Sequence, residues 1–212
     1  ERHCKFCNVS ESAGSTQTVQ QQVIAYVNKD ENYKTEDFAY IDVANYLCAF
    51  IDNGAGSYPF DGAYFANVSY MKQQAKAKNP NIKIVLTIAN RNIVAFETWL
   101  KTPTTRAQFA NHLVGVITAH DMDGLDIDFE FVLPEEREAY IAFVTLLTER
   151  CNAAGFEILV ALAPKTSATQ RGLLYESHDY GGLATAANSV LLMTYEWGYT
   201  YGPPLAVAPI PN

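Results

Sequence analysis

Short apolar runs alternate along the chain with longer stretches in which apolar residues recur every three or four positions. The short runs indicate buried strands, because strands that are covered on both faces are continuously apolar. The longer stretches indicate helices with one apolar face. The expected strands are Val23–Val27, Val43–Ile51, Ile82–Ala89, Leu125–Glu130, Glu157–Leu162 and Ser189–Tyr195. Strands that alternate with helices predict an α/β fold with a parallel sheet.

Cap and breaker residues mark the ends of the expected helices. Thr102 precedes Pro103, which is typical of a cap residue followed by proline at the first helical position. Pro134 opens another helix with acidic residues in its first turn, and Gly155 ends that helix. The remaining expected helices are Asn67–Lys78 and the short segment Gly182–Asn188.

The number of β/α units fits either an open doubly wound sheet or most of a (β/α)8 barrel. No glycine-rich phosphate loop follows the first strand, where the sequence reads Tyr26-Val27-Asn28-Lys29-Asp30, and this disfavours a nucleotide-binding sheet. We therefore predict an α/β (β/α)8 TIM barrel, of which about six units lie in residues 21–212. Residues 1–20 are mostly small and polar, and they predict an N-terminal tail or linker.

Four cysteines give little guidance on metal binding. Cys4 and Cys7 have metal-ligand spacing, but no second cysteine pair or histidine pair completes a zinc site. A local disulfide or a tether to another molecule is therefore expected in the tail. Cys48 and Cys151 are expected to be buried thiols or disulfide partners.

The charge of the chain limits its partners. The 212 residues carry a formal net charge of −8 and contain no basic cluster, which argues against nucleic acid or an anionic membrane surface as a partner. No apolar run approaches the length of a membrane span. Thirteen Tyr, eleven Phe and two Trp would suit stacking on sugar rings, although most of them are expected in the core.

The segment Asp123-Gly124-Leu125-Asp126-Ile127-Asp128-Phe129-Glu130 places four carboxylates on an otherwise apolar strand. Side chains alternate along a strand, so Asp126, Asp128 and Glu130 are expected on one face and the apolar residues on the other. Burial and like-charge repulsion should raise the pKa of at least one of these carboxyls. A carboxyl that keeps its proton near neutral pH is a general acid. A hard-cation site for Mg²⁺ or Ca²⁺ is the alternative interpretation of this pattern.

This octapeptide resembles the DGxDxDxE signature of glycoside hydrolase family 18, the chitinase-like barrels. Other segments resemble the family in the same order, from Tyr26 on the first strand to Leu192-Met193-Thr194-Tyr195-Glu196 on the sixth. The segments between them are Asn45–Phe50, Lys83–Ile88 and Arg106–Ala110. His178-Asp179-Tyr180 and Tyr195-Glu196-Trp197-Gly198 are similar to the branch that contains bacterial spore-cortex-lytic N-acetylglucosaminidases. The family continues with two more units after the sixth strand, so we expect a further part of the same chain or another subunit to close the barrel.

The resemblance implies retaining hydrolysis of β-1,4-linked N-acetylglucosamine glycans, with the acetamido oxygen of the substrate as nucleophile. The candidate substrates are chitin, chito-oligosaccharides and peptidoglycan. Glu130 would protonate the glycosidic oxygen, Asp128 would orient the acetamide, and Asp126 would support Asp128 through a shared proton. Tyr195 would donate a hydrogen bond to the acetamido carbonyl. The residues expected to bind substrate are Asp123, Met193, Glu196, Trp197 and Tyr26, and no metal or cofactor is expected.

Some residues retain a second interpretation. Trp197 is either a platform for a sugar ring or a core residue, and Tyr26 is either a substrate contact or core. His3, His112, His120 and His178 share no metal-ligand spacing, and we expect them at the surface or at helix caps. The hypothesis for the whole protein is a secreted or extracellular hydrolase. The alternative is a non-catalytic extracellular glycan-binding or structural protein on the same barrel.

Overall fold

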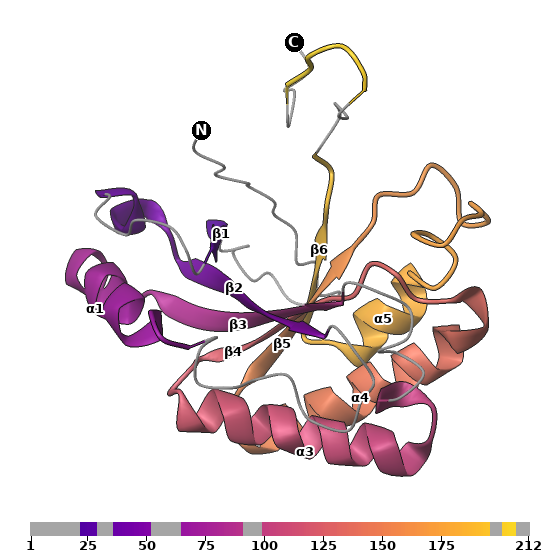
Figure 1. Cartoon of the computed structure of the whole chain (residues 1–212), viewed down its shortest axis with the longest axis horizontal. Coiled ribbons are helices and arrows are strands. Elements are labelled where there is room, and N and C mark those ends of the chain that lie inside the picture. The colour runs from indigo at the N-terminus through magenta and orange to yellow at the C-terminus, as the bar shows by residue number, and fades with distance from the viewer. Residues whose placement is uncertain (1–21, 29–35, 52–64, 91–98, 196–200, 207–212) are drawn as a thin grey trace, which may run out of the picture.

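Six parallel strands form one sheet in which each strand pairs with the next one in the sequence (Figure 1). The computed structural model describes residues 22–28, 36–51, 65–90, 99–195 and 201–206. The strands are β1 (Ile24–Asn28), β2 (Val43–Ile51), β3 (Lys83–Asn90), β4 (Gly124–Asp128), β5 (Glu157–Leu162) and β6 (Ser189–Leu192). The predicted N-terminal tail, with Cys4 and Cys7, lies outside the described residues.

The helices α1 (Val68–Lys78), α3 (Pro103–Ala119), α4 (Arg137–Ala153) and α5 (Tyr180–Ala186) all lie on one side of this sheet (Figure 1). Two 3-10 helices, η1 (Glu36–Tyr40) and η2 (Pro134–Glu136), complete the described elements. A doubly wound sheet would carry helices on both faces. Helices on one face and strands in sequential order are typical of a TIM barrel, so the described strands form a curled half-barrel.

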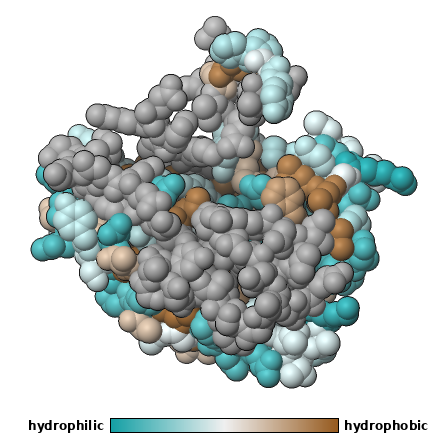
Figure 2. All heavy atoms as spheres, viewed as in Figure 1, coloured by the Kyte–Doolittle hydropathy of each residue, from teal (hydrophilic) through white to brown (hydrophobic). Residues whose placement is uncertain are grey.

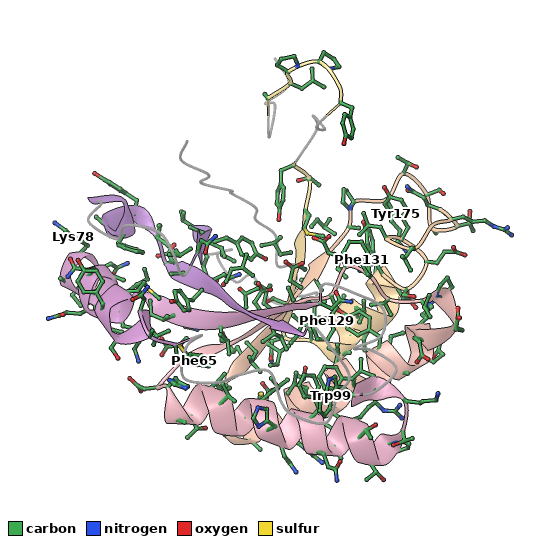
Figure 3. All side chains as sticks on the ribbon, in the orientation of Figure 1. Phe65, Lys78, Trp99, Phe129, Phe131 and Tyr175 are labelled. Atoms are coloured by element: carbon green, nitrogen blue, oxygen red, sulfur yellow. The ribbon has the colours of Figure 1, made fainter. Side chains whose placement is uncertain are left out.

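The main core fills the space between the sheet and the helices. Leu125, Ile127 and Phe129 point into it from β4 and the residue that follows it, and all three are almost completely buried. The rings of Phe109, Phe143 and Phe129 stack in sequence, with centroids 5.5 and 6.3 Å apart. Figure 3 shows Phe129 and Trp99 on this helix side of the sheet. The outer rim, where α3 lies, is mainly hydrophilic (Figure 2), as expected for amphipathic helices.

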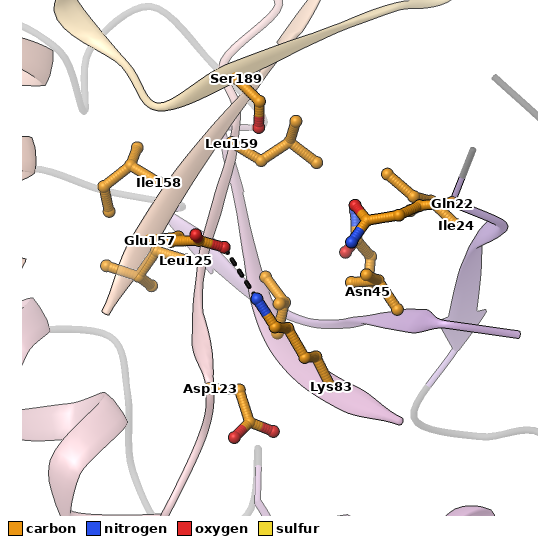
Figure 4. A pocket seen from close by; sticks show the side chains of 12 residues that line it. Gln22, Ile24, Asn45, Lys83, Asp123, Leu125, Glu157, Ile158, Leu159 and Ser189 are labelled. Atoms are coloured by element: carbon orange, nitrogen blue, oxygen red, sulfur yellow. Dashed lines mark hydrogen bonds and ion pairs between the residues drawn. The ribbon is translucent and has the colours of Figure 1, made fainter. Parts of the chain in front are cut away.

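The opposite, concave face of the sheet carries a buried polar layer. Asn45 on β2, Thr87 on β3 and Asp126 on β4 are each completely buried. The curl brings the two edge strands toward each other, because Ile24 of β1 and Ser189 of β6 line the same pocket (Figure 4). The alternation that the sequence predicts for β4 is therefore confirmed: its apolar row faces the helices, and its acidic row faces the inside of the half-barrel.

Several predicted boundaries were wrong by a few residues. The strand β4 ends at Asp128 and β6 ends at Leu192, so Glu130 and Tyr195 lie beyond their strands. Both strands end where their pairing with the neighbouring strand ends. Pro134 begins the 3-10 helix η2, and α4 starts after it. Gly155 has a φ of 86°, which explains why the helix stops just before it.

The short helix expected over Gly182–Asn188 is α5, which starts two residues earlier than predicted, after Asp179. No helix in the described part of the chain is both long and apolar enough to cross a membrane.

Candidate active site

The carboxyl group of Asp126 lies at the centre of the polar layer. Its Oδ2 accepts hydrogen bonds from Asn45 Nδ2 at 3.1 Å and from Thr87 Oγ1 at 2.9 Å. Thr87 is the register partner of Asp126 on β3, and Asn45 lies one strand further on β2. Three neighbouring strands thus direct one polar side chain each to the same place inside the half-barrel.

Burial raises the pKa of Asp126 to about 7, against the lowering effect of the nearby polar side chains of Thr87, Tyr26 and Asn45. Its Oδ1 is buried and has no hydrogen-bond partner among the described residues. Since Oδ2 already accepts two hydrogen bonds, Oδ1 is the oxygen that can carry the proton. Asp126 can therefore exist in either protonation state near neutral pH, as expected for a member of a proton-sharing cluster.

Tyr26 adds a phenol to this cluster from the edge strand β1. Burial and, after it, the nearby carboxyls of Asp126 and Asp128 raise its pKa well above the ordinary value, and Tyr195 adds to the effect. The hydroxyl group is buried and approaches Asp126 without reaching hydrogen-bond geometry. Tyr26 on one edge strand therefore lies near both carboxyls and near Tyr195, which follows the other edge strand, β6.

Asp128 and Glu130 are half-buried and lie at the carboxyl end of β4. Asp128 is the last residue of the strand, two positions after Asp126 on the same face, and Glu130 lies two positions further. In TIM-barrel enzymes, the carboxyl ends of the strands carry the catalytic groups. The fold thus places three carboxyls in a row, from the buried Asp126 through Asp128 to Glu130, which solvent can reach.

Two buried polar side chains, whose roles the sequence did not indicate, support the chain around Glu130. Asn90, the last residue of β3, accepts a hydrogen bond from Glu130 N through its Oδ1 at 3.0 Å. His178 is completely buried, and its Nε2 lies 2.9 Å from Phe129 O. The expectation of a surface or capping role for His178 was therefore wrong, because its ring fills the space between the ends of β4 and β5. The segment His178-Asp179-Tyr180 drew attention to this residue but gave no indication of its role.

The histidine is held in one tautomer. His178 Nδ1 accepts a hydrogen bond from Ala163 N at 2.8 Å, so Nε2 carries the ring hydrogen and donates it to Phe129 O. Burial lowers the pKa of His178, which favours the neutral ring in this position.

Asp123 lies at the opposite end of β4. Its Oδ2 accepts a hydrogen bond from Ile84 N at 2.7 Å, and its own N donates to Ile84 O. Glu130 lies seven positions later along the chain, roughly 23 Å away if the chain is extended. Asp123 lines a pocket of about 50 Å³ near Lys83 and Glu157, whose side chains form an ion pair at 2.9 Å (Figure 4). The structure gives Asp123 this strand-joining role and does not bring it to the other carboxyls.

The sixth strand leads toward the same end of the sheet as Glu130. Met193 N donates to Leu162 O at 2.9 Å, directly after β6, and the side chains of Met193 and Tyr195 are half-buried. Alternation from the buried Leu191 places both side chains on the concave face. The predicted residues Glu196 and Trp197 lie outside the described part of the chain.

The donor set around Asp126 bears on the hard-cation alternative. An amide NH₂ and a hydroxyl group both direct hydrogen atoms at its Oδ2, and hydrogen-bond donors compete with a cation for that oxygen. Within the ranges that the structure describes, no three His, Cys, Asp or Glu side chains are arranged to hold a metal ion. The geometry therefore favours a proton-sharing cluster over a cation site.

Comparisons with known proteins identify the family of this chain. A family model described as "Glycosyl hydrolases family 18" matches residues 22–206. The chain is 38% identical over 138 residues to the cortical fragment-lytic enzyme of Bacillus subtilis, a match that covers 63% of this chain and 32% of the relative. It is 30% identical over 136 residues to chitinase B of Serratia marcescens, covering 57% of this chain and 27% of that one.

A solved structure shows the same fold. The spore cortex-lytic enzyme SleL of Bacillus cereus matches with a TM-score of 0.74 and 23% identity, over 93% of this chain and 49% of that chain. The match thus spans about a third of the cortical fragment-lytic enzyme and about half of the SleL structure.

Proposed function

The chain belongs to the glycosyl hydrolases of family 18, and on that premise we propose that the complete protein hydrolyses glycans that contain N-acetylglucosamine. The observation that carries this proposal is the row of carboxyls on β4. A buried Asp126 with a pKa near 7 lies behind Asp128, and Glu130 follows at the carboxyl end of the strand. In this order Glu130 can act as the proton donor, and Asp126 and Asp128 behind it can exchange a proton with each other.

In the proposed reaction, Glu130 donates its proton to the glycosidic oxygen as the bond to the anomeric carbon breaks. The acetamido oxygen of the same sugar attacks that carbon and forms a cyclic oxazolinium-like intermediate. The ionised Glu130 then takes a proton from water, whose oxygen attacks the anomeric carbon and reopens the ring. The two displacements on one carbon give net retention of configuration.

The neighbouring groups have supporting roles in this scheme. Asp128 accepts a hydrogen bond from the acetamide N–H and stabilises the positive charge of the intermediate. Asp126 shares a proton with Asp128, which a pKa near 7 allows at neutral pH. Tyr195 donates its hydroxyl hydrogen to the acetamido carbonyl and holds that oxygen toward the anomeric carbon. Met193 and Tyr26 are proposed to line the floor below the reacting sugar.

We choose the proposed substrates from the names of two relatives. One is a cortical fragment-lytic enzyme and another is a chitinase. The higher identity to the former leads us to propose fragments of peptidoglycan as the first substrate to test, with chito-oligosaccharides second. We also propose a secreted or extracellular location, because wall and matrix glycans lie outside the cell membrane.

Substitution of Glu130 tests the proposed role. In the complete protein, Glu130→Gln should lower kcat by about a hundredfold or more on peptidoglycan fragments or a chito-oligosaccharide, since general acid catalysis contributes about that much. Glu135→Gln is the matched control, because Glu135 is an exposed glutamate five positions later. Unchanged turnover in Glu130→Gln would overturn the assignment. Binding of the oligosaccharide by the unmodified protein without any turnover would support a binding protein instead.

A further inference from the structure

We propose that Asn90 and His178 are positioning residues, which fix Glu130 by hydrogen bonding to the peptide group that precedes it. This inference rests on the proposed function, because it takes Glu130 as the proton donor. Its evidence, however, is the hydrogen bonding of the chain between Phe129 and Phe131.

The peptide group that joins Phe129 to Glu130 is held at both ends by side chains from other elements. Asn90 Oδ1 accepts from Glu130 N at 3.0 Å, and His178 Nε2 donates to Phe129 O at 2.9 Å. Asn90 ends β3, whereas His178 lies between β5 and α5. The two residues are far from each other in the sequence, yet they fix the N–H and the C=O of a single peptide plane.

Asn90 also reaches the next peptide group. Its Nδ2 donates to Phe131 O at 3.1 Å, and its Oδ1 makes a longer contact of 3.4 Å with Phe131 N. One amide side chain therefore contacts the chain on both sides of the Glu130 Cα atom. Asn90 is only 5% exposed, so water competes little for these hydrogen bonds. The backbone angles of Glu130 are thereby restricted.

His178 belongs to a segment that ties the loop after β4 to the end of β5. Its neighbour Ser177 donates from Oγ to Leu133 O at 2.6 Å. Tyr180 donates from its hydroxyl group to Ala163 O at 2.7 Å. These two contacts hold the segment in place without touching the peptide group before Glu130. They provide controls that separate general support of the loop from positioning of Glu130.

The side chain of Phe129 supplies a third anchor. It is 1% exposed, and its ring centroid lies 5.9 Å from that of Tyr140. With this ring and the following peptide plane both fixed, the freedom left to the Glu130 carboxyl is mainly that of its own side-chain torsions. A proton donor needs this precision, because a displacement of about 1 Å can cost about a hundredfold in rate.

Kinetics of His178 variants of the complete protein test the proposal. We expect His178→Leu to lower kcat by about 10- to 100-fold while KM changes less than about threefold, because the substrate contacts are retained. His178→Gln keeps a donor nitrogen near Phe129 O and should recover most of that loss. Tyr180→Phe removes both hydrogen bonds of the Tyr180 hydroxyl group, to Ala163 O and from Lys165 N, and should leave kcat within about twofold of the unmodified protein. Equal losses of kcat in His178→Leu and Tyr180→Phe would overturn the proposal, as would no loss in either.

Hydrogen exchange of the Glu130 amide gives a readout that does not depend on activity. The amide should exchange slowly in the unmodified protein and at least about tenfold faster in Asn90→Ala, since its acceptor is lost. Fast exchange in the unmodified protein would contradict the positioning role even if His178→Leu failed to fold. If the protein hydrolyses no glycan and the Glu130 amide still exchanges slowly, the proposed function fails. The hydrogen bonding of the peptide group by Asn90 and His178 then stands.

Discussion

Thr87 Oγ1 donates a hydrogen bond of 2.9 Å to Oδ2 of Asp126, its register partner on the neighbouring strand. This contact stabilises the ionised form of a carboxyl that burial otherwise drives toward the neutral form. The balance leaves the pKa of Asp126 near 7, where a small change in the environment alters the protonation state. The properties of the site should therefore respond to single hydrogen bonds in the polar layer.

Removal of the Thr87 hydroxyl should raise the pKa of Asp126 further. In Thr87→Val, the loss of a hydrogen bond to the ionised form is expected to move that pKa upward by roughly one pH unit. An NMR titration of carboxyl-labelled aspartate in the complete protein measures this. Thr148→Val is the control, because Thr148 is a buried threonine on α4 and its hydroxyl group has no described partner. A lower pKa of Asp126 in Thr87→Val would contradict this account.

The raised pKa of Asp126 should also appear in the pH dependence of stability. The folded state holds a proton on Asp126 between pH 3.8 and about 7, whereas the unfolded state has lost it. The contribution of Asp126 to the free energy of unfolding is therefore fully present below pH 3.8 and falls as the pH rises to about 7. Each pH unit corresponds to about 1.4 kcal/mol, so the total fall is at most about 4 kcal/mol.

Chemical unfolding at pH 4.5 and pH 7.5 tests this linkage. Asp126→Asn should become more stable relative to the unmodified protein as the pH rises, because its side chain cannot ionise. Asp121→Asn is the control, because Lys72 lowers the pKa of the exposed Asp121 carboxyl, which is therefore ionised at both pH values. Its stability difference from the unmodified protein should hardly change between them. A stability difference for Asp126→Asn that does not change with pH would show that Asp126 has an ordinary pKa.

Gly124 is required by the close approach of β4 to β5. A Cβ atom at this position would lie 2.6 Å from Glu157 O, a backbone atom on the register partner. Gly124→Ala should therefore lower the free energy of unfolding by about 1–3 kcal/mol. Gly115→Ala on the exposed side of α3 meets nothing within 4 Å and should raise it by about 0.5–1 kcal/mol. Thermal or urea unfolding of both variants compares the two effects, and equal effects would contradict the packing described for β4.

The hydroxyl group of Tyr195 should matter for turnover more than for binding. Tyr195→Phe is expected to lower kcat by about a hundredfold with a smaller change in KM, because the proposed hydrogen bond holds the acetamido oxygen in position to attack the anomeric carbon. Tyr201→Phe is the matched control, since Tyr201 is 90% exposed. Steady-state kinetics on a soluble oligosaccharide measures both. A loss confined to KM would assign Tyr195 to ground-state binding alone.

The sequence predicted the architecture well where local patterns decide it. The bounds of Val43–Ile51 and Glu157–Leu162 match β2 and β5, because continuous apolar runs mark strands that are buried on both faces. The alternating octapeptide placed Asp126 on the face opposite Leu125 and Ile127, as the structure confirms. These features depend only on the pattern of apolar and polar side chains along each strand.

Contacts between segments that lie far apart in the chain could not be predicted from the sequence. Asn90 looks like an ordinary strand end, and its role depends on a loop about 40 residues later along the chain. His178 was expected at the surface because nothing nearby in the sequence indicates the backbone groups that its ring joins. Asp123 belongs to the signature by position, but its carboxyl caps a neighbouring strand. In each case the partner is a backbone group, which carries no sequence signal.

The configuration of the first product is the sharpest test of hydrolysis with participation of the substrate acetamide. The complete protein, mixed with a short N-acetylglucosamine oligosaccharide or a peptidoglycan fragment, can be followed by proton NMR before the product mutarotates. We expect the β-anomer to form first and then to equilibrate, because two displacements on the anomeric carbon retain its configuration. Initial formation of the α-anomer would contradict the participation of the acetamide, and with it the roles proposed for Asp128 and Tyr195.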